Sequence, residues 1–193
     1  MTPLPLGILA LAGVTGGGAA YELLETTTLN SGASSITFSG LSAYSDFKHL
    51  QIRGTQRLTG PSTLWSGYAI LNGVSTSGNY TSHFLGGNGS SVYTGQSTHT
   101  DKMQMTEIPG ADNTSGIFNS FVMDIFDFAD SSKNTTIRNL GGVNYANPST
   151  GGRITLNSGL YLSTNPITSV TFDAFAGTQT FIAGCRLSIY GGK

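Results

Sequence analysis

From Tyr21 onward, apolar and polar residues alternate with a period of two, which is typical of half-buried β-strands and not of helices. In LQIRGTQRL, the apolar Leu50, Ile52 and Leu58 are expected on one face and the polar Gln51, Arg53, Thr55 and Arg57 on the other. Three later segments, RITLNSGLYL, SVTFDAFA and FIAGCRLSIY, repeat this alternation. Their expected core positions are Ile154, Leu156, Leu160 and Leu162, then Val170, Phe172 and Ala174, and finally Phe181, Ala183, Cys185, Leu187 and Ile189.

Clusters of turn-forming residues separate these segments. Examples are GNGSS, ADNTSG, DSSKN and NPSTGG, and their spacing is that of an all-β sandwich or jelly roll. We therefore predict about nine or ten strands, no helix, and two antiparallel sheets packed as a jelly-roll-like β-sandwich.

One segment, FVMDIFDFAD, is apolar on both faces of its expected strand. Val122, Phe126 and Phe128 fall on the face opposite the one that holds Phe121 and Ile125. A strand of this kind lies either at the centre of a fold or at a subunit interface. Val122, Phe126 and Phe128 are therefore candidate contacts between subunits.

The first residues of the chain are apolar but broken by proline and glycine. The apolar side chains are those of Leu4, Leu6, Ile8, Leu9, Leu11 and Val14. A secretory signal would need a basic region before them, but the first Lys or Arg is Lys48, and the stretch is too short to span a membrane. Full burial of these six side chains would contribute roughly 9–18 kcal/mol, so we expect a surface to cover them.

Two ways of burying this segment remain open. It is either a first strand folded on its own domain, or an arm that inserts into a partner subunit. The glycines at 16, 17 and 18 would decouple such an arm from the rest of the chain. We divide the chain accordingly into an apolar anchor arm with a glycine hinge, residues 1–20, and a β-sandwich domain, residues 21–193.

The low charge of the chain narrows the choice of partners. Charged residues make up 10% of the sequence and the formal net charge is −1, with no basic cluster that would bind a nucleic-acid backbone. So few charges suit a subunit inside an assembly better than a freely diffusing monomer. The one cysteine, Cys185, excludes an intrachain disulfide.

The sequence contains few candidates for catalytic or metal-binding residues. Asp124, Asp127 and Asp130 are three residues apart, a spacing that sends alternate carboxylates to opposite faces of a strand, so we expect Asp130 to shape a turn and no metal to bind. The three histidines, His49, His83 and His99, have no metal-binding spacing and lie near no nucleophile motif. We predict no catalytic residue, no cofactor and no enzymatic activity.

Three aromatic residues could bind sugars. Trp65, Tyr68 and Tyr80 would form a stacking platform for a glycan if the fold placed their rings on one surface. The alternative is that these rings belong to the core.

Several segments taken in order, among them PLGILALAG, DFKHLQIRG, NYTSHFLGGNGSS, MDIFDFADSSKNTTIRNLGG, SGLYLSTNPITSVTF and AGCRLSIYGGK, resemble a group of small virion structural proteins of tailed bacteriophages, common in phages of aquatic bacteria. The resemblance covers nearly the whole chain. It implies a non-enzymatic β-sandwich of the virion, assembled in the host bacterial cytoplasm and used for capsid decoration or in a fibre or tail appendage.

The resemblance and the apolar arm together lead to one functional hypothesis. The arm would attach the subunit to another capsid or tail protein, with head decoration or a head fibre favoured over a tail fibre or appendage. We expect a homo-oligomer, with a trimer favoured, and no contact with nucleic acid or membrane. The alternative is a lectin-like module that binds a glycan of the host surface.

Overall fold

The computed structural model describes residues 20–145, 151–174 and 179–193, which form twelve β-strands and one short 3₁₀ helix, Leu41–Tyr44. The strands are β1 (Tyr21–Thr28), β2 (Ser35–Ser39), β3 (His49–Thr55), β4 (Leu64–Leu71), β5 (Tyr80–Gly87), β6 (Val92–Thr100), β7 (Met103–Pro109), β8 (Ser120–Phe126), β9 (Thr135–Asn144), β10 (Gly152–Tyr161), β11 (Ser169–Asp173) and β12 (Arg186–Gly192). All but one of the residues of the predicted anchor arm lie outside the described part of the chain.

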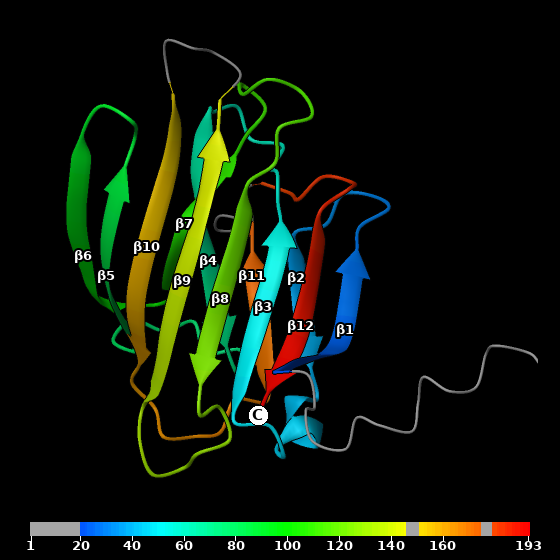
Figure 1. The fold of residues 1–193 in the computed structure, drawn as a ribbon, viewed down its shortest axis with the longest axis vertical. Helices are drawn as coiled ribbons and strands as arrows, with labels where there is room; N and C mark the ends of the chain where they lie inside the picture. The colour runs from blue at the N-terminus through cyan, green and yellow to red at the C-terminus, as the bar shows by residue number, and fades with distance from the viewer. Residues whose placement is uncertain (1–19, 146–150, 175–178) are drawn as a thin grey trace, which may run out of the picture.

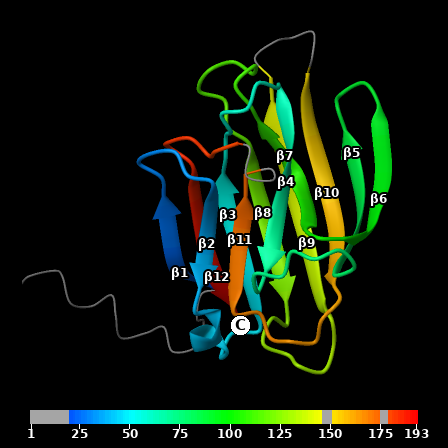
Figure 2. The same ribbon diagram turned by 180° about the vertical axis from the view of Figure 1, so that it is seen from behind.

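The strands form two antiparallel sheets packed face to face. The large sheet has eight strands in the order β1-β12-β3-β8-β9-β10-β5-β6, and the small sheet has four in the order β2-β11-β4-β7. Figure 1 is viewed onto the large sheet, and Figure 2 shows the small sheet in front of it. The predicted all-β antiparallel sandwich is confirmed.

Eight of the strands are connected as a jelly roll. They pair as β1 with β12, β2 with β11, β3 with β8, and β4 with β7, and successive pairs alternate between the two sheets. An antiparallel ribbon wrapped in this way has jelly-roll connectivity. The hairpin β5–β6, inserted between β4 and β7, and the hairpin β9–β10, inserted between β8 and β11, extend the large sheet beyond the roll.

The core lies between the sheets and is formed by alternate residues of the roll strands. Phe38, Ile52, Phe172 and Leu187 are at most 1% exposed. Each buried side chain of this size contributes roughly 1.5–3 kcal/mol to stability. The predicted inward face of SVTFDAFA is confirmed, because the other two members of that set, Val170 and Ala174, are also fully buried.

The prediction of which side chains of β10 point into the core is wrong. Ile154 and Leu156, expected in the core, are 59% and 42% exposed, whereas the intervening Thr155 and Asn157 are buried. In β10 the polar residues therefore face the core and the aliphatic residues face outward.

The reason for this inversion is the strand that β10 packs against. β7 is an edge strand of the small sheet, so the backbone N–H and C=O groups on its free side have no strand partner. Because these groups are buried, they need hydrogen-bond partners from elsewhere in the protein. The large sheet and its neighbouring loop supply amides. Asn139 Oδ1 accepts a hydrogen bond from the Thr106 N–H at 3.0 Å, and Asn157 Nδ2 donates to the Gln104 carbonyl at 3.4 Å. Asn119 Nδ2 donates to the Glu107 carbonyl at 3.0 Å.

The β5–β6 hairpin at the end of the large sheet is held by aromatic rings over glycines. Gly86 pairs with Tyr93 and Gly95 pairs with Phe84 in the strand register. A Cβ atom at Gly86 or Gly95 would lie 2.4 Å from the ring of its partner, so glycine is required for this packing. Two such pairs, in edge contact with each other, hold the hairpin beyond the jelly roll.

Candidate functional site

The outward face of the large sheet, which we call the outer face, is the most unusual surface of the described protein. All of the exposed large apolar side chains among the described residues lie on it. They are Tyr21, Leu23, Leu85, Val92, Val122, Leu140, Ile154 and Leu156. On the small sheet, by contrast, the outward positions of β2 are Ser35, Thr37 and Ser39.

Four of these side chains form a continuous row, which we call the apolar row. In the strand register Val122 pairs with Leu140, Leu140 with Leu156, and Leu156 with Leu85, so the row crosses β8, β9, β10 and β5. Their exposed fractions are 36%, 48%, 42% and 51% in that order. Ile154 and Val92 border the row and are 59% and 74% exposed. Contiguous exposed apolar side chains of this kind mark interaction sites.

A polar row with satisfied hydrogen bonds flanks the apolar row on the same face. The buried carboxylate of Asp124 accepts hydrogen bonds from Gln51 Nε2 at 2.7 Å and from Arg138 Nη2 at 2.8 Å. Arg53 Nε donates to Gln51 Oε1 at 2.7 Å, and the Arg53 guanidinium lies 4.5 Å from the Tyr190 ring centroid. The Asp124 carboxylate beside the apolar row is therefore already paired within the subunit.

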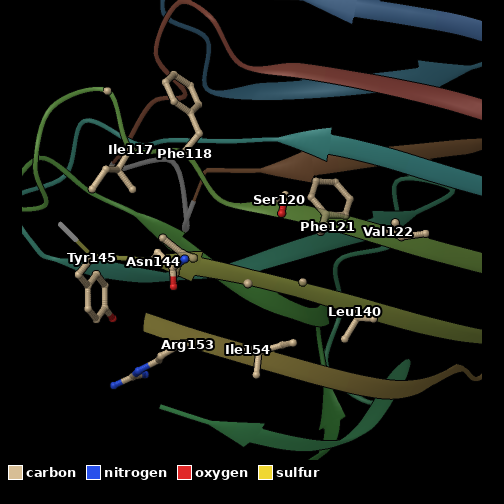
Figure 3. A pocket seen from close by; sticks show the side chains of 14 residues that line it. Ile117, Phe118, Ser120, Phe121, Val122, Leu140, Asn144, Tyr145, Arg153 and Ile154 are labelled. Atoms are coloured by element: carbon tan, nitrogen blue, oxygen red, sulfur yellow. The ribbon is translucent and has the colours of Figure 1, made fainter. Parts of the chain in front are cut away.

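A groove of about 790 Å³ is continuous with one end of the apolar row (Figure 3). Gly142 lies in its floor between Ser120 and Ile154 and has no side chain to fill the space. Ile117 and Phe118, from the loop before β8, form one wall, and Tyr145 and Arg153 form the other.

Both walls of the groove are fixed by hydrogen bonds. The buried Arg57 donates to the carbonyls of Asn113, Thr114 and Ile117, each at 2.8 Å, and so holds the loop that carries Ile117 and Phe118. This corrects the expectation that Arg57 lies on the polar face of a strand, because β3 ends at Thr55.

On the opposite wall, Arg153 Nη1 donates to Glu107 Oε1 at 2.6 Å, and this hydrogen bond raises the pKa of the guanidinium. Partial burial raises the pKa of the Tyr145 hydroxyl. At neutral pH the groove therefore presents a neutral phenol beside a paired guanidinium.

The predicted subunit contacts are split between two locations. Val122 and Phe126 do lie on the outer face, where Phe126 is partly covered by the Arg138 guanidinium, 5.3 Å from its ring centroid. Phe128 is wrong as a surface contact because it follows the end of β8 and is 1% exposed, within the core.

The predicted aromatic platform is not formed. Tyr80 is fully buried and stacks on Tyr161, with ring centroids 5.1 Å apart, so it cannot contact a glycan. Trp65 packs against the core, and Tyr68 points away from it because the next residue, Ala69, is buried. The three rings therefore do not share one surface.

Asp130, His49 and His83 each form hydrogen bonds with a different residue. Asp130 Oδ1 accepts a hydrogen bond from the Ser132 N–H at 2.7 Å, which confirms the predicted turn; its hydrogen bonds to Ser132 lower its pKa. His49 Nδ1 accepts from the Asp127 N–H at 3.1 Å, and His83 pairs with Gln96. Within residues 20–145, 151–174 and 179–193, there is no group of three or more His, Cys, Asp or Glu residues that could hold a metal ion.

The predicted anchor arm and the question of a membrane span remain. The anchor residues Leu4, Leu6, Ile8, Leu9, Leu11 and Val14 lie outside the described residues. In the described part of the chain, no helix has the length and apolar character needed to cross a membrane.

Sequence reasoning missed most of the apolar row. Leu85 and Leu140 are single aliphatic residues in the segments HFLGG and RNLGG, and each gives no periodic signal on its own. Only the register of the strands places them side by side with Val122 and Leu156. The β8 segment did give a signal, because it is apolar on both faces, and this pattern correctly predicted that Val122 faces outward.

Comparison of the chain with protein-family models and with curated proteins gives no match.

Proposed function

We propose that this chain is a non-enzymatic structural subunit of a bacteriophage virion, in which a β-sandwich head is attached to the particle through the apolar arm of residues 1–20. Head decoration or a head fibre is the favoured location, and a tail fibre or appendage is the alternative. The observation that carries the proposal is the exposed apolar row, because a surface of this kind needs a protein partner.

Two further features support a role in assembly. Only 10% of the residues are charged, which gives a free monomer little protection against association. The apolar row also lies mainly on the two inserted hairpins, which widen the large sheet beyond the jelly roll. The chain therefore adds apolar surface that the jelly roll itself does not need.

The test is the protein content of purified particles of the phage that encodes the chain. We expect mass spectrometry to find the protein in the particles in a fixed ratio to the major capsid protein. A variant with Leu9→Asp and Leu11→Asp in the arm should be expressed but missing from the particles, whereas Thr37→Lys, on the outward face of the small sheet, should be incorporated normally. Particles that lack the wild-type protein, or that incorporate the arm variant at normal occupancy, would contradict the proposal.

The groove supports a second candidate, a lectin-like site for a host-surface glycan. Its volume of about 790 Å³ is within the range of ligand sites, and Tyr145 and Asn144 offer a ring and an amide there, as sugar binding requires. Saturable binding to a glycan array that Tyr145→Ala abolishes and Trp65→Ala leaves intact would support this candidate. Binding lost only in Trp65→Ala, or no binding, would contradict it.

A further inference from the structure

The outer face raises the question of what covers it. We propose that a second copy of this chain packs on the outer face, so that two large sheets stack face to face about a two-fold axis. This inference deepens the proposed function, since it names a partner for the same surface. Dimerisation in solution requires no other virion protein, so the two proposals can fail separately.

The size of the surface suits a pair of identical subunits. Eight strands spaced about 4.8 Å apart span about 34 Å, and seven residues of a strand cover about 23 Å. The outer face is therefore about 800 Å² per copy, which is the usual contribution of each partner to a stable protein interface. A small ligand would leave most of this area uncovered.

The pattern of side chains has the anatomy of an interface. Val122, Leu140 and Leu156 form an apolar centre on adjacent strands, and Leu85 extends it. The polar row from Arg53 to Arg138 lies beside this centre, between it and Phe126, and its Asp124 is already hydrogen-bonded within the subunit. Protein interfaces combine apolar side chains at their core with polar, hydrogen-bonded groups.

The geometry of stacked sheets fits the same partner. Two sheets pack face to face about 10 Å apart, with their side chains interdigitating, when both present aliphatic residues at alternate positions. The outward residues Ile154 and Leu156 of β10 show this alternation with the inward Thr155 and Asn157. A two-fold axis through such a face brings the same patch of each copy into contact, which closes the assembly at two subunits.

The experiment is the molar mass of the purified full-length chain by light scattering over about 1–100 μM protein. We expect a mass of twice the monomer's 20.1 kDa, rather than the trimer favoured by the sequence. Leu140→Lys and Leu156→Lys should each raise the dissociation constant by about 100-fold or more, because each introduces a charge on both sides of the interface. Thr37→Lys, on the opposite face of the sandwich, should leave the dimer intact.

Two further variants keep the test decisive. If a lysine variant fails to fold by circular dichroism, Leu140→Thr replaces it, because threonine favours strands and removes only apolar contact. A full-length chain with Leu9→Asp and Leu11→Asp distinguishes a second copy from the arm as the occupant. A dimer that persists in this arm variant supports the proposal.

Four results would overturn the inference. These are a wild-type monomer at every concentration, a wild-type trimer, a dimer that survives the outer-face variants, and a dimer abolished by the arm variant. The last result would assign the outer face to residues 3–14. A wild-type monomer that is still incorporated into particles would overturn this inference alone and leave the proposed function standing.

Discussion

The buried amide of Asn139 offers a direct test of why the core between β9, β10 and β7 is polar. Asn139 is fully buried, and its Oδ1 is the acceptor for the Thr106 N–H at 3.0 Å. Asn139→Leu keeps a side chain of similar size but removes this acceptor. Because β7 is an edge strand, the Thr106 N–H has no strand partner on that side to replace it.

The expected cost follows from leaving a buried donor unsatisfied. Such a group costs about 1–3 kcal/mol, and the second hydrogen bond of Asn139, from Nδ2 to the Val122 carbonyl, is long at 3.4 Å and adds little. We therefore expect Asn139→Leu to lower the free energy of unfolding by about 2 kcal/mol, which corresponds to about 4–8 °C in Tm for a domain of this size.

Urea unfolding followed by circular dichroism measures this loss, at one protein concentration for all variants. The matched control is Asn144→Leu, an exposed asparagine on the same strand, for which we expect a change within about 0.5 kcal/mol. Equal stability of Asn139→Leu and the wild type would refute the idea that inward amides are present to satisfy the edge of β7.

Three further predictions concern single buried groups. Arg57→Leu should cost about 2–4 kcal/mol in urea unfolding, because three carbonyls of the groove loop lose a charged donor; an unchanged midpoint would contradict this. Burial raises the pKa of Tyr80 to about 12 from 10.0, so the folded state binds this proton more tightly than the unfolded state. The stabilisation that this hydroxyl provides is therefore complete below pH 10 and is lost as the pH rises toward 12. Tyr80→Phe should have a lower Tm at neutral pH, because it loses the hydrogen bonds of the hydroxyl, and its Tm should decrease less between pH 10 and 12 than that of the wild type. Burial also raises the pKa of the Cys185 thiol, so a thiol reagent should label it slowly in the native protein and rapidly in urea; equally fast native labelling would show that the site opens.

The elements that sequence reasoning predicted well are those whose two faces meet different environments. In β11, Val170 and Phe172 face the core and Ser169 and Thr171 do not, so the period of two is visible in the residues themselves. Leu187 and Ile189 in β12 also face the core as predicted, whereas Ala183, expected with them, is exposed in the turn before this strand. Two packed antiparallel sheets follow from several such strands separated by turns.

The errors arose where tertiary contacts overrode hydrophobicity. The alternation in β10 predicts the wrong inward face because the inner side of this strand must bind the backbone edge of β7, and the sequence does not show which strand has a free edge. Alternation also predicts an outward position for Arg57 and Phe128, but each residue follows the end of a strand, where alternation no longer applies. The apolar row could not be predicted because it depends on the register of four strands.

The measurement that tests the central claim most directly is the accessibility of the outer face in intact particles. Leu156→Cys places a thiol in the apolar row, and Thr37→Cys places one on the outward face of the small sheet, in a protein whose native Cys185 is buried. Maleimide labelling is followed in purified phage particles and, for reference, in the urea-unfolded chain. We expect Leu156→Cys to be protected in the particle and Thr37→Cys to be labelled. Equally rapid labelling of both thiols in the particle would show that the outer face stays open to solvent and would contradict a role in assembly.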